Sequence, residues 1–277
     1  MSRRTFLAAL AGTPVLAALI AGCGDDSTQS SAYSFPEVAD EVVLRIGTSG
    51  GFVPAGADFV NLPSLLITGD GRVLTPGAIT LEYPGPLVMP MFERSITAEG
   101  IEKVLKLADD AALLGTPPDY AMPPDRQIAD APDTVVTITV NGTTYEHRAT
   151  ALGFDSPDGG PSTPARDNLN EFVMLMNDLA AVAGADNLGP DEPYVPEQYR
   201  FLALVVDPTQ FTEPSPTIVD WPADTGVTLA DAAQCAVVSA EVGEAMFAGA
   251  NSLTFFQEAD VVYQLSVALA LPGDALC

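Results

Sequence analysis

The most restrictive local signal in this chain is the dipeptide Asn141-Gly142, which separates two segments of strand-forming residues. Asparagine followed by glycine supplies the positive φ that both central positions of a tight hairpin turn require. In residues 134–140 every second residue from Val136 onward is apolar, which gives the strand one apolar face. Together with residues 143–152, this pattern predicts an antiparallel hairpin whose apolar face is covered by another layer.

One helix is expected before this hairpin and one after it. The first begins after Thr97, a good N-cap, and closes near Gly115, with apolar residues recurring every three or four positions. The second begins at Pro164, a favourable first-turn residue, and continues to Ala183. Strands are predicted before the first helix at residues 42–46, 62–68, 72–75, 78–83 and 87–96.

The segment 184–196 is rich in glycine, proline and acids and is the best candidate for an internal boundary. It divides the folded part into halves of 36–184 and 185–277. In the second half we predict strands at 201–206 and 217–221, a helix over 228–240, and a strand pair at 253–257 and 261–271.

Around its first helix, each half therefore contains the order strand, strand, helix, strand, strand. The pattern predicts an α+β fold with antiparallel sheets, each covered by helices. The shared order has two explanations: a degenerate duplication of a ββαββ unit, or the chance order that is common in α+β domains.

The N-terminus carries a specific pattern of a different kind. Arg3 and Arg4 precede an apolar stretch over residues 6–21 that is too short and too interrupted to make a comfortable membrane span. The stretch closes on Ile20-Ala21-Gly22-Cys23. These residues resemble the export signals of twin-arginine-exported bacterial lipoproteins of the actinobacterial type. An ordinary signal peptide with a chance cysteine is the alternative.

This resemblance implies that residues 1–22 are a signal peptide and that Cys23 becomes the lipid-bearing first residue of the mature protein. Residues 23–35 are mostly small, polar and acidic, a composition that suits a flexible tether. The chain is then expected at the outer face of the cytoplasmic membrane, held to the lipid bilayer through acylated Cys23. The remaining residues resemble uncharacterised secreted α+β proteins.

The mature part is strongly acidic. Removing residues 1–22 takes away two of the 11 basic residues and none of the 37 acidic ones, which leaves a net charge of −28. Such a domain repels phosphate backbones, so we expect no nucleic-acid partner. Two cysteines remain after Cys23, and in an exported chain Cys235 and Cys277 are predicted to form a disulfide, with two free thiols as the alternative.

One string resembles a catalytic motif, because Gly47-Thr48-Ser49-Gly50-Gly51 matches G-x-S-x-G. A nucleophile elbow needs a helix directly after the serine, whereas the residues that follow are typical of a loop. His147, the one histidine of the chain, would have to serve as the base. Ser49 and His147 are therefore weak catalytic candidates, and a glycine-rich turn with a structural histidine is the simpler interpretation.

Metal and cofactor chemistry has little support in the sequence. One histidine and two paired cysteines leave too few ligands for zinc or iron. Asp155 and Asp158 are weak calcium candidates, because their segment lacks the full twelve-residue loop and its closing glutamate. No phosphate-binding or dinucleotide-binding loop is present, so no cofactor is predicted.

The leading functional hypothesis is a non-catalytic envelope module that binds a small-molecule ligand or a protein partner. One alternative is a secreted hydrolase that uses Ser49 or a pair of carboxylates. Another is a structural component of the cell envelope. Hydrolase substrates tested with Ser49→Ala, and thermal shifts with small molecules, separate the three hypotheses.

Overall fold

The Asn141-Gly142 hairpin forms where the alternation predicts it. β5 (Asp133–Val140) pairs antiparallel with β6 (Thr143–Thr150) in a regular register. Both turn residues have positive φ, 52° for Asn141 and 71° for Gly142, which is the backbone conformation that this dipeptide tolerates best. The predicted hairpin is therefore confirmed.

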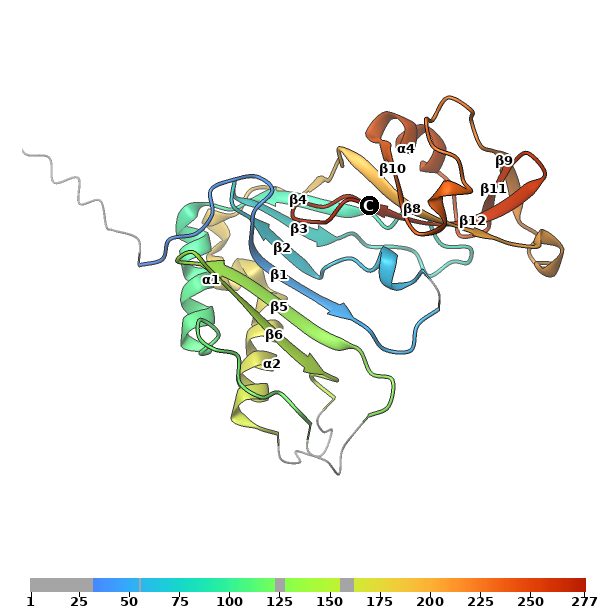
Figure 1. Ribbon diagram of the computed structural model, residues 1–277. Helices are drawn as coiled ribbons and strands as arrows, with labels where there is room; N and C mark the ends of the chain where they lie inside the picture. Colours follow the sequence, from blue (N-terminus) through green and yellow to red (C-terminus); the bar gives the residue numbers. More distant parts are fainter. Residues whose placement is uncertain (1–31, 55, 123–127, 155–161) are drawn as a thin grey trace, which may run out of the picture. The chain divides into compact units, whose positions relative to one another are not determined.

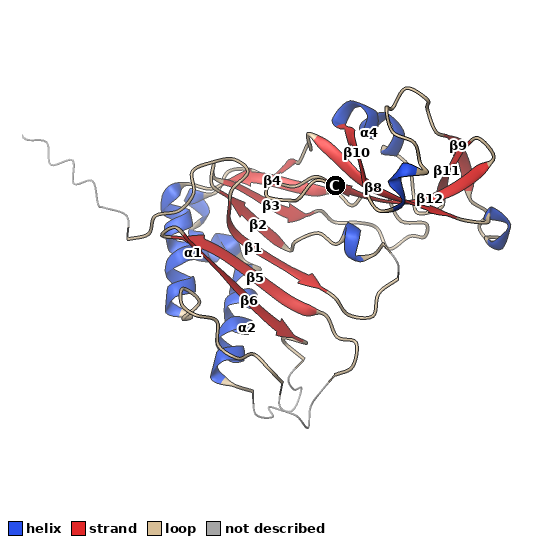
Figure 2. Cartoon of the chain, in the orientation of Figure 1, coloured by secondary structure: helices blue, strands red, loops and turns tan. Residues whose placement is uncertain are grey.

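The computed structural model describes residues 32–277, with the exception of residues 55, 123–127 and 155–161 (Figure 1). In this part of the chain, strands combine into two sheets and helices pack against them, so the predicted α+β class is confirmed (Figure 2). No helix in these ranges is long and apolar enough to cross a membrane.

The hairpin forms one edge of a seven-stranded antiparallel sheet with the order β6-β5-β1-β2-β3-β4-β7. Its other strands are β1 (Val42–Ser49), β2 (Leu65–Thr68), β3 (Arg72–Pro76), β4 (Met91–Ser95) and β7 (Glu192–Pro193). β7 pairs with β4 although it lies beyond residue 184. The first sheet thus takes strands from both sides of the predicted boundary.

Helices cover one face of this sheet (Figure 2). They are α1 (Ala98–Asp110), α2 (Pro164–Met176) and α3 (Leu179–Ala183). The Thr97 hydroxyl accepts a hydrogen bond from the Gly100 main-chain N–H at 3.2 Å, so the predicted N-cap is confirmed. Asp178 accepts from the Ala181 N–H at 3.1 Å and starts α3, which divides the single helix predicted over 164–183 into two.

The opposite face of the central strands is also buried. In β2, Leu65 and Ile67 pack under the helices, whereas Leu66 belongs to a second core that it shares with Leu74 of β3 and with the second sheet. All four residues of β2 are buried for this reason. The second core also contains six aromatic side chains from the C-terminal half of the chain: Tyr199, Phe201, Trp221, Phe247, Phe256 and Tyr263.

The second sheet has five strands in the order β10-β8-β12-β11-β9. Its elements are β8 (Gln198–Val205), β9 (Thr217–Asp220), β10 (Ala236–Ser239), α4 (Ala240–Phe247), β11 (Thr254–Glu258) and β12 (Val261–Leu269). β9 runs parallel to β11, so this sheet is mixed and not purely antiparallel as predicted. The strand orders of the two sheets differ, and the duplication of a ββαββ unit stays a prediction.

The prediction of a helix over residues 228–240 is wrong. Thr228 does accept from the Asp231 N–H at 3.2 Å, but only a 3₁₀ turn, η5 (Asp231–Ala233), follows. Residues 236–239 form β10 instead and pair with β8, because a ladder to a neighbouring strand outweighs a weak helix preference. The helix forms later, as α4.

The strand predicted over residues 78–83 is also wrong, and the strand predicted over 87–96 shortens to β4. Pro84, Pro86 and Pro90 lie in this segment, and proline cannot donate to a strand ladder. The segment instead forms a loop that bonds to the second half of the chain, with the Leu87 N–H donating to the Ala250 carbonyl oxygen at 3.0 Å.

The C-terminal segment ties the two sheets together. Asp274 accepts from Arg45 Nη1 of β1 at 2.7 Å, and its other carboxylate oxygen lies 3.1 Å from Arg200 Nη2 of β8. Its side chain is only 7% exposed, so water screens these ion pairs weakly. The predicted disulfide between Cys235 and Cys277 is confirmed. Cys277 lies three residues after Asp274, so the disulfide fixes the end of the chain.

Replacing both Cys235 and Cys277 with serine is expected to lower the free energy of unfolding by about 4 kcal/mol, because the disulfide closes a loop over a separation of 42 residues in the unfolded chain. Urea unfolding followed by circular dichroism measures this change. Reduced wild-type protein should unfold at the same urea concentration as the double variant. Equal midpoints for oxidised wild type and the variant would contradict the prediction.

Candidate functional site

Ser49 and His147 lie on opposite faces of the first sheet. Arg148 Nη1 donates to the Ser49 hydroxyl oxygen at 2.7 Å, which places both side chains on the face away from the helices. His147 precedes Arg148 in β6, and successive side chains of a strand point to opposite faces. The structure therefore does not bring the two catalytic candidates together, and the described residues 50–54 directly after Ser49 form no helix.

His147 is fully buried in the helix-covered core, and both of its ring nitrogens are bonded. Nε2 lies 2.8 Å from the Leu113 carbonyl oxygen, which can only accept, so Nε2 carries the hydrogen. Nδ1 then accepts from the Tyr120 hydroxyl at 2.7 Å. Burial lowers the pKa of His147 and raises the pKa of Tyr120 to about 12, which keeps both groups neutral. This histidine is structural.

Arg166 of α2 has a second structural role close by. It is fully buried, and its guanidinium donates to the main-chain carbonyl oxygens of Tyr120 at 2.7 Å and Thr150 at 2.9 Å. Charge-assisted bonds to carbonyls hold the segment around Tyr120 and the end of β6 against α2. The loops at this end of the sheet are thereby attached to its helical layer.

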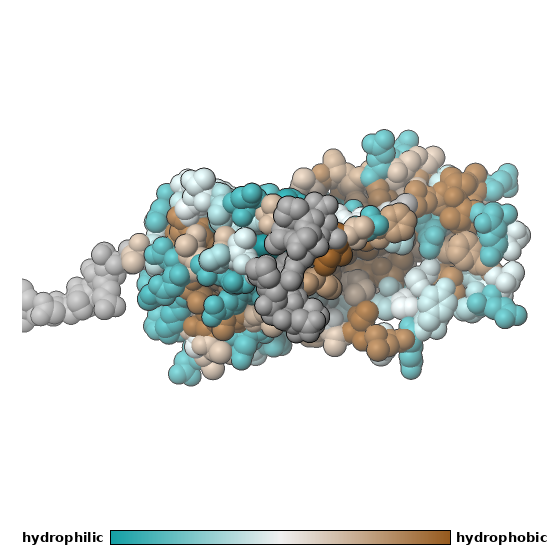
Figure 3. Space-filling model, turned by 90° about the horizontal axis from the view of Figure 1, so that it is seen from below, coloured by the Kyte–Doolittle hydropathy of each residue, from teal (hydrophilic) through white to brown (hydrophobic). Residues whose placement is uncertain are grey.

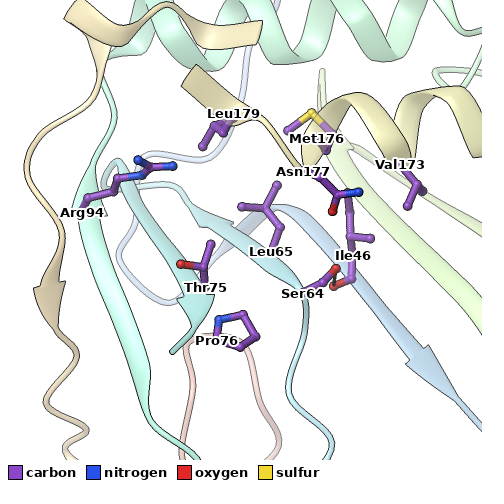
Figure 4. Close-up of a pocket in the computed structure, with 10 residues that line it drawn as sticks. All are labelled: Ile46, Ser64, Leu65, Thr75, Pro76, Arg94, Val173, Met176, Asn177 and Leu179. Carbon is purple, nitrogen blue, oxygen red and sulfur yellow. Dashed lines mark hydrogen bonds between the residues drawn. The ribbon is translucent and has the colours of Figure 1, made fainter. Parts of the chain in front are cut away.

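A cavity of about 300 Å³ lies between the first sheet and the junction of α2 with α3 (Figure 4). Figure 4 shows side chains from both layers around one space, with Arg94 and Asn177 supplying nitrogen and oxygen atoms and Leu65 lying between them. The residues that line it are Ile46, Ser64, Leu65, Thr75, Pro76, Arg94, Val173, Met176, Asn177 and Leu179. The cavity thus combines aliphatic side chains with polar groups from Ser64, Thr75, Arg94 and Asn177.

The β3–β4 pairing directs Arg94 toward this cavity. Arg94 lies opposite Val73, and Val73 packs in the core under the helices. The Arg94 Nε atom is buried and has no hydrogen-bond partner among the described residues. Its paired carboxylate is Asp191, 3.6 Å from Nε, and the Asp191 side chain is 57% exposed. A buried donor without an acceptor is costly, so an acceptor bound in the cavity would relieve that cost.

The other polar groups of the cavity are neutral. The Ser64 hydroxyl donates to the Ile46 carbonyl oxygen at 3.2 Å, which occupies its proton. The Asn177 amide has only a weak contact, 3.9 Å, with the Met174 sulfur, so it can turn toward a ligand. A guanidinium, an amide, the hydroxyls of Ser64 and Thr75 and the aliphatic side chains can together bind an organic anion, with its charged end on Arg94.

The other predicted site residues have different outcomes. Cys23, Arg3, Arg4, Asp155 and Asp158 lie outside the described residues. Within the described part, no three histidine, cysteine or acidic side chains gather closely enough to hold a metal ion. No protein-family model, curated protein or solved structure matches this chain, so the argument for its function depends on its own geometry.

His147 is expected to titrate below its ordinary pKa of about 6.5, because burial disfavours the imidazolium. The unfolded chain then takes up the proton first, so this group lowers the stability of the fold as the pH falls below about 6.5. Proton NMR of untagged protein measures the midpoint directly, since the chain has one histidine. Urea-unfolded protein is the control, and a folded midpoint at or above the unfolded one would contradict the prediction.

Proposed function

We propose that this chain is a lipid-anchored binding protein of the cell envelope that holds a small organic anion in the cavity beside Arg94. The observation that carries the proposal is the buried Nε atom of Arg94, a residue that lines this cavity: Nε has no hydrogen-bond partner among the described residues, and its nearest carboxylate, Asp191, lies 3.6 Å away. Arg45, Arg72 and Arg148 each have a carboxylate oxygen within 3.3 Å. In a chain with 37 acidic residues, an arginine this weakly paired is the exception.

The dimensions and charges define the class of ligand. A cavity of about 300 Å³ is at the small end of ligand sites, so the ligand has few non-hydrogen atoms. A carboxylate accepts two parallel hydrogen bonds from a guanidinium, and a short hydrocarbon part would contact Leu65 and Leu179. The strongly negative chain disfavours polyanions. We therefore propose a short-chain or aromatic monocarboxylate.

Binding fits the cavity better than catalysis. Among the described residues that line it there is no histidine, cysteine or carboxylate to act as a nucleophile or base. The Ser64 hydroxyl already donates its proton to a main-chain carbonyl. The first alternative, a hydrolase that uses Ser49, lacks its base, because His147 lies on the other face of the sheet. The second alternative, a structural envelope component, would leave the Arg94 cavity without a role.

The anchoring part of the proposal rests on the resemblance of residues 1–23 to lipoprotein export signals. Ser34 is the first well-fixed point of the mature chain, because its main-chain N–H donates to Asn141 Oδ1 at 2.9 Å. Residues 24–33 separate Cys23 from Ser34, and ten residues span at most about 36 Å when extended. The domain would remain close to the membrane and free to reorient.

Hexanoate and benzoate are expected to raise the melting temperature of the wild-type protein, whereas the neutral hexanamide is not. Arg94→Gln should weaken carboxylate binding by a factor of about ten or more in calorimetry, because it removes a charge-assisted pair. Arg148→Gln is the matched control, since Arg148 lies away from the cavity, and it should bind like wild type. Carboxylate binding that is unchanged in Arg94→Gln would contradict the proposal. So would the absence of binding to both hexanoate and benzoate.

Cys23→Ser is expected to move the protein from the membrane fraction to the soluble or precursor fraction of an expressing actinobacterial host. Arg3→Lys combined with Arg4→Lys should leave the uncut precursor in the cytosol, because the export receptor reads both arginines. Ser27→Ala, in the tether, is the control that should behave like wild type. Mass spectrometry of the wild type showing an unmodified, uncut N-terminus would disprove the anchoring.

A further inference from the structure

Three loops leave the first sheet at the same end. The register places Ser49, the last residue of β1, opposite Asp133, the first residue of β5, which in turn lies opposite Thr150, the last residue of β6. The loops 50–54, 128–132 and 151–154 therefore gather at one edge. Main-chain hydrogen bonds connect them: 3.2 Å from the Phe52 N–H to the Asp130 oxygen, and 2.9 Å from the Ala151 N–H to the Pro132 oxygen.

These loops expose large apolar side chains. Phe52 is 86% exposed and Phe154 is 67% exposed, and Val53 and Ile128 are also exposed. We call these four residues the loop surface. Single exposed apolar residues are ordinary, but two aromatic rings on bonded loops form the kind of patch that marks interaction sites. Figure 3 shows hydrophobic residues among hydrophilic ones on the side of the molecule that faces down in Figure 1.

A fourth loop adds to this end. β3 runs in the same direction as β1, since each of them is antiparallel to β2, so the loop after β3 leaves the same end of the sheet. Leu81 in this loop is fully exposed, and Tyr83 is largely exposed. Apolar side chains thus project from successive loops at one end of the sheet.

Close main-chain packing between two of the loops supports the loop surface. Gly51 has a φ of 87°, and a Cβ atom there would lie 3.1 Å from the Asp130 oxygen and 3.2 Å from the Pro132 nitrogen. Glycine thus allows the first two loops to pack backbone against backbone. A surface held in this way loses little conformational entropy when a partner binds.

The loop surface and Ser34 lie at opposite ends of β5. The Asn141 N–H donates to the Ser34 carbonyl oxygen at 2.6 Å, which fixes the start of the described chain at the hairpin turn. β5 has eight residues and spans about 26 Å, so the loop surface lies at the end of β5 that is remote from Ser34.

Charge indicates which partner fits. The described loops 50–54, 56–64, 77–90, 128–132 and 151–154 carry acids, including Asp58, Glu82 and Asp130, and contain no lysine or arginine. Anionic headgroups and a second copy of this chain would both be repelled. We propose that the loop surface docks a partner protein through a basic amphipathic segment, whose apolar side chains contact Phe52 and Phe154 and whose cations face these acids.

Synthetic peptides of defined chemistry test the proposal, with the full mature chain made as Cys23→Ser so that it carries no lipid. A fluorescent leucine–lysine amphipathic peptide is expected to bind. A leucine–glutamate peptide of the same length should not bind, and a serine–lysine peptide should bind more weakly by a factor of about ten, because apolar anchors contribute most of the affinity. Added salt should weaken the binding of the leucine–lysine peptide.

Phe52→Ser combined with Phe154→Ser should reduce affinity for the leucine–lysine peptide by a factor of about ten or more. Val38→Ser and Val195→Ser replace exposed residues elsewhere and should leave affinity unchanged. Unfolding midpoints identify any variant that is destabilised. If the phenylalanine variant is destabilised, Glu82→Lys provides a second test: this charge reversal on an exposed loop residue should weaken peptide binding.

Several outcomes would overturn the proposal. Peptide affinity that is equal in wild type and in both the Phe52/Phe154 and Glu82 variants would show that the loop surface is not used. Self-association in sedimentation experiments, abolished by the Phe52 and Phe154 changes, would assign the surface to a second copy. Binding to phosphatidylcholine or phosphatidylglycerol vesicles through the same residues would assign it to a bilayer. Arg94→Gln should leave peptide binding unchanged, which separates this test from that of the cavity.

Discussion

The two-residue repeat of the strands in the first sheet is the constraint on which the rest of the structure depends. The sheet is covered by helices on one face and, over β2 to β4, by the second sheet on the other. Each residue is therefore assigned to a core or to a surface by its parity along the strand. The same rule places His147 in the helix-covered core and Ser49 on the other face, and it directs Arg94 toward the helices.

The second constraint is electrostatic. Burying Asp274 would be unfavourable if it were unpaired, because a desolvated carboxylate loses its hydration. Arg45 and Arg200 offset this cost from two different sheets, and the Leu271 N–H donates to the same carboxylate at 3.3 Å. Since the ion pairs form only when both sheets are in place, they favour one arrangement of the sheets over alternatives. The nearby disulfide then limits how far the C-terminal segment can move.

Local signals predicted the elements that depend on local chemistry. Asn141-Gly142, Thr97 and Pro164 each act through their own backbone conformation or cap, and each appears where expected. The segment 228–240 failed because the pairing of β10 with β8 is a long-range effect. α4 gave no clear helical signal because it contains Gly243, a residue required where the Tyr199 ring leaves no room for a Cβ atom.

The cavity was beyond local prediction for a related reason. Its wall forms where Asp178 divides α2 from α3 and where β4 turns Arg94 inward, and neither position has a motif. The available signal was an arginine within a strand whose partner position, Val73, is apolar.

The acidity of the chain relates the two proposed sites to one another. Because 37 acidic residues surround few cations, most arginines are used to neutralise nearby carboxylates and to fasten strands and loops. Arg94 differs from these arginines, because its Nε atom is buried without a hydrogen bond among the described residues and its nearest carboxylate, Asp191, lies 3.6 Å away. The loop surface differs, because its apolar side chains lie on described loops that carry acids and contain no lysine or arginine. One composition thus favours a small anion inside the fold and a basic partner outside it.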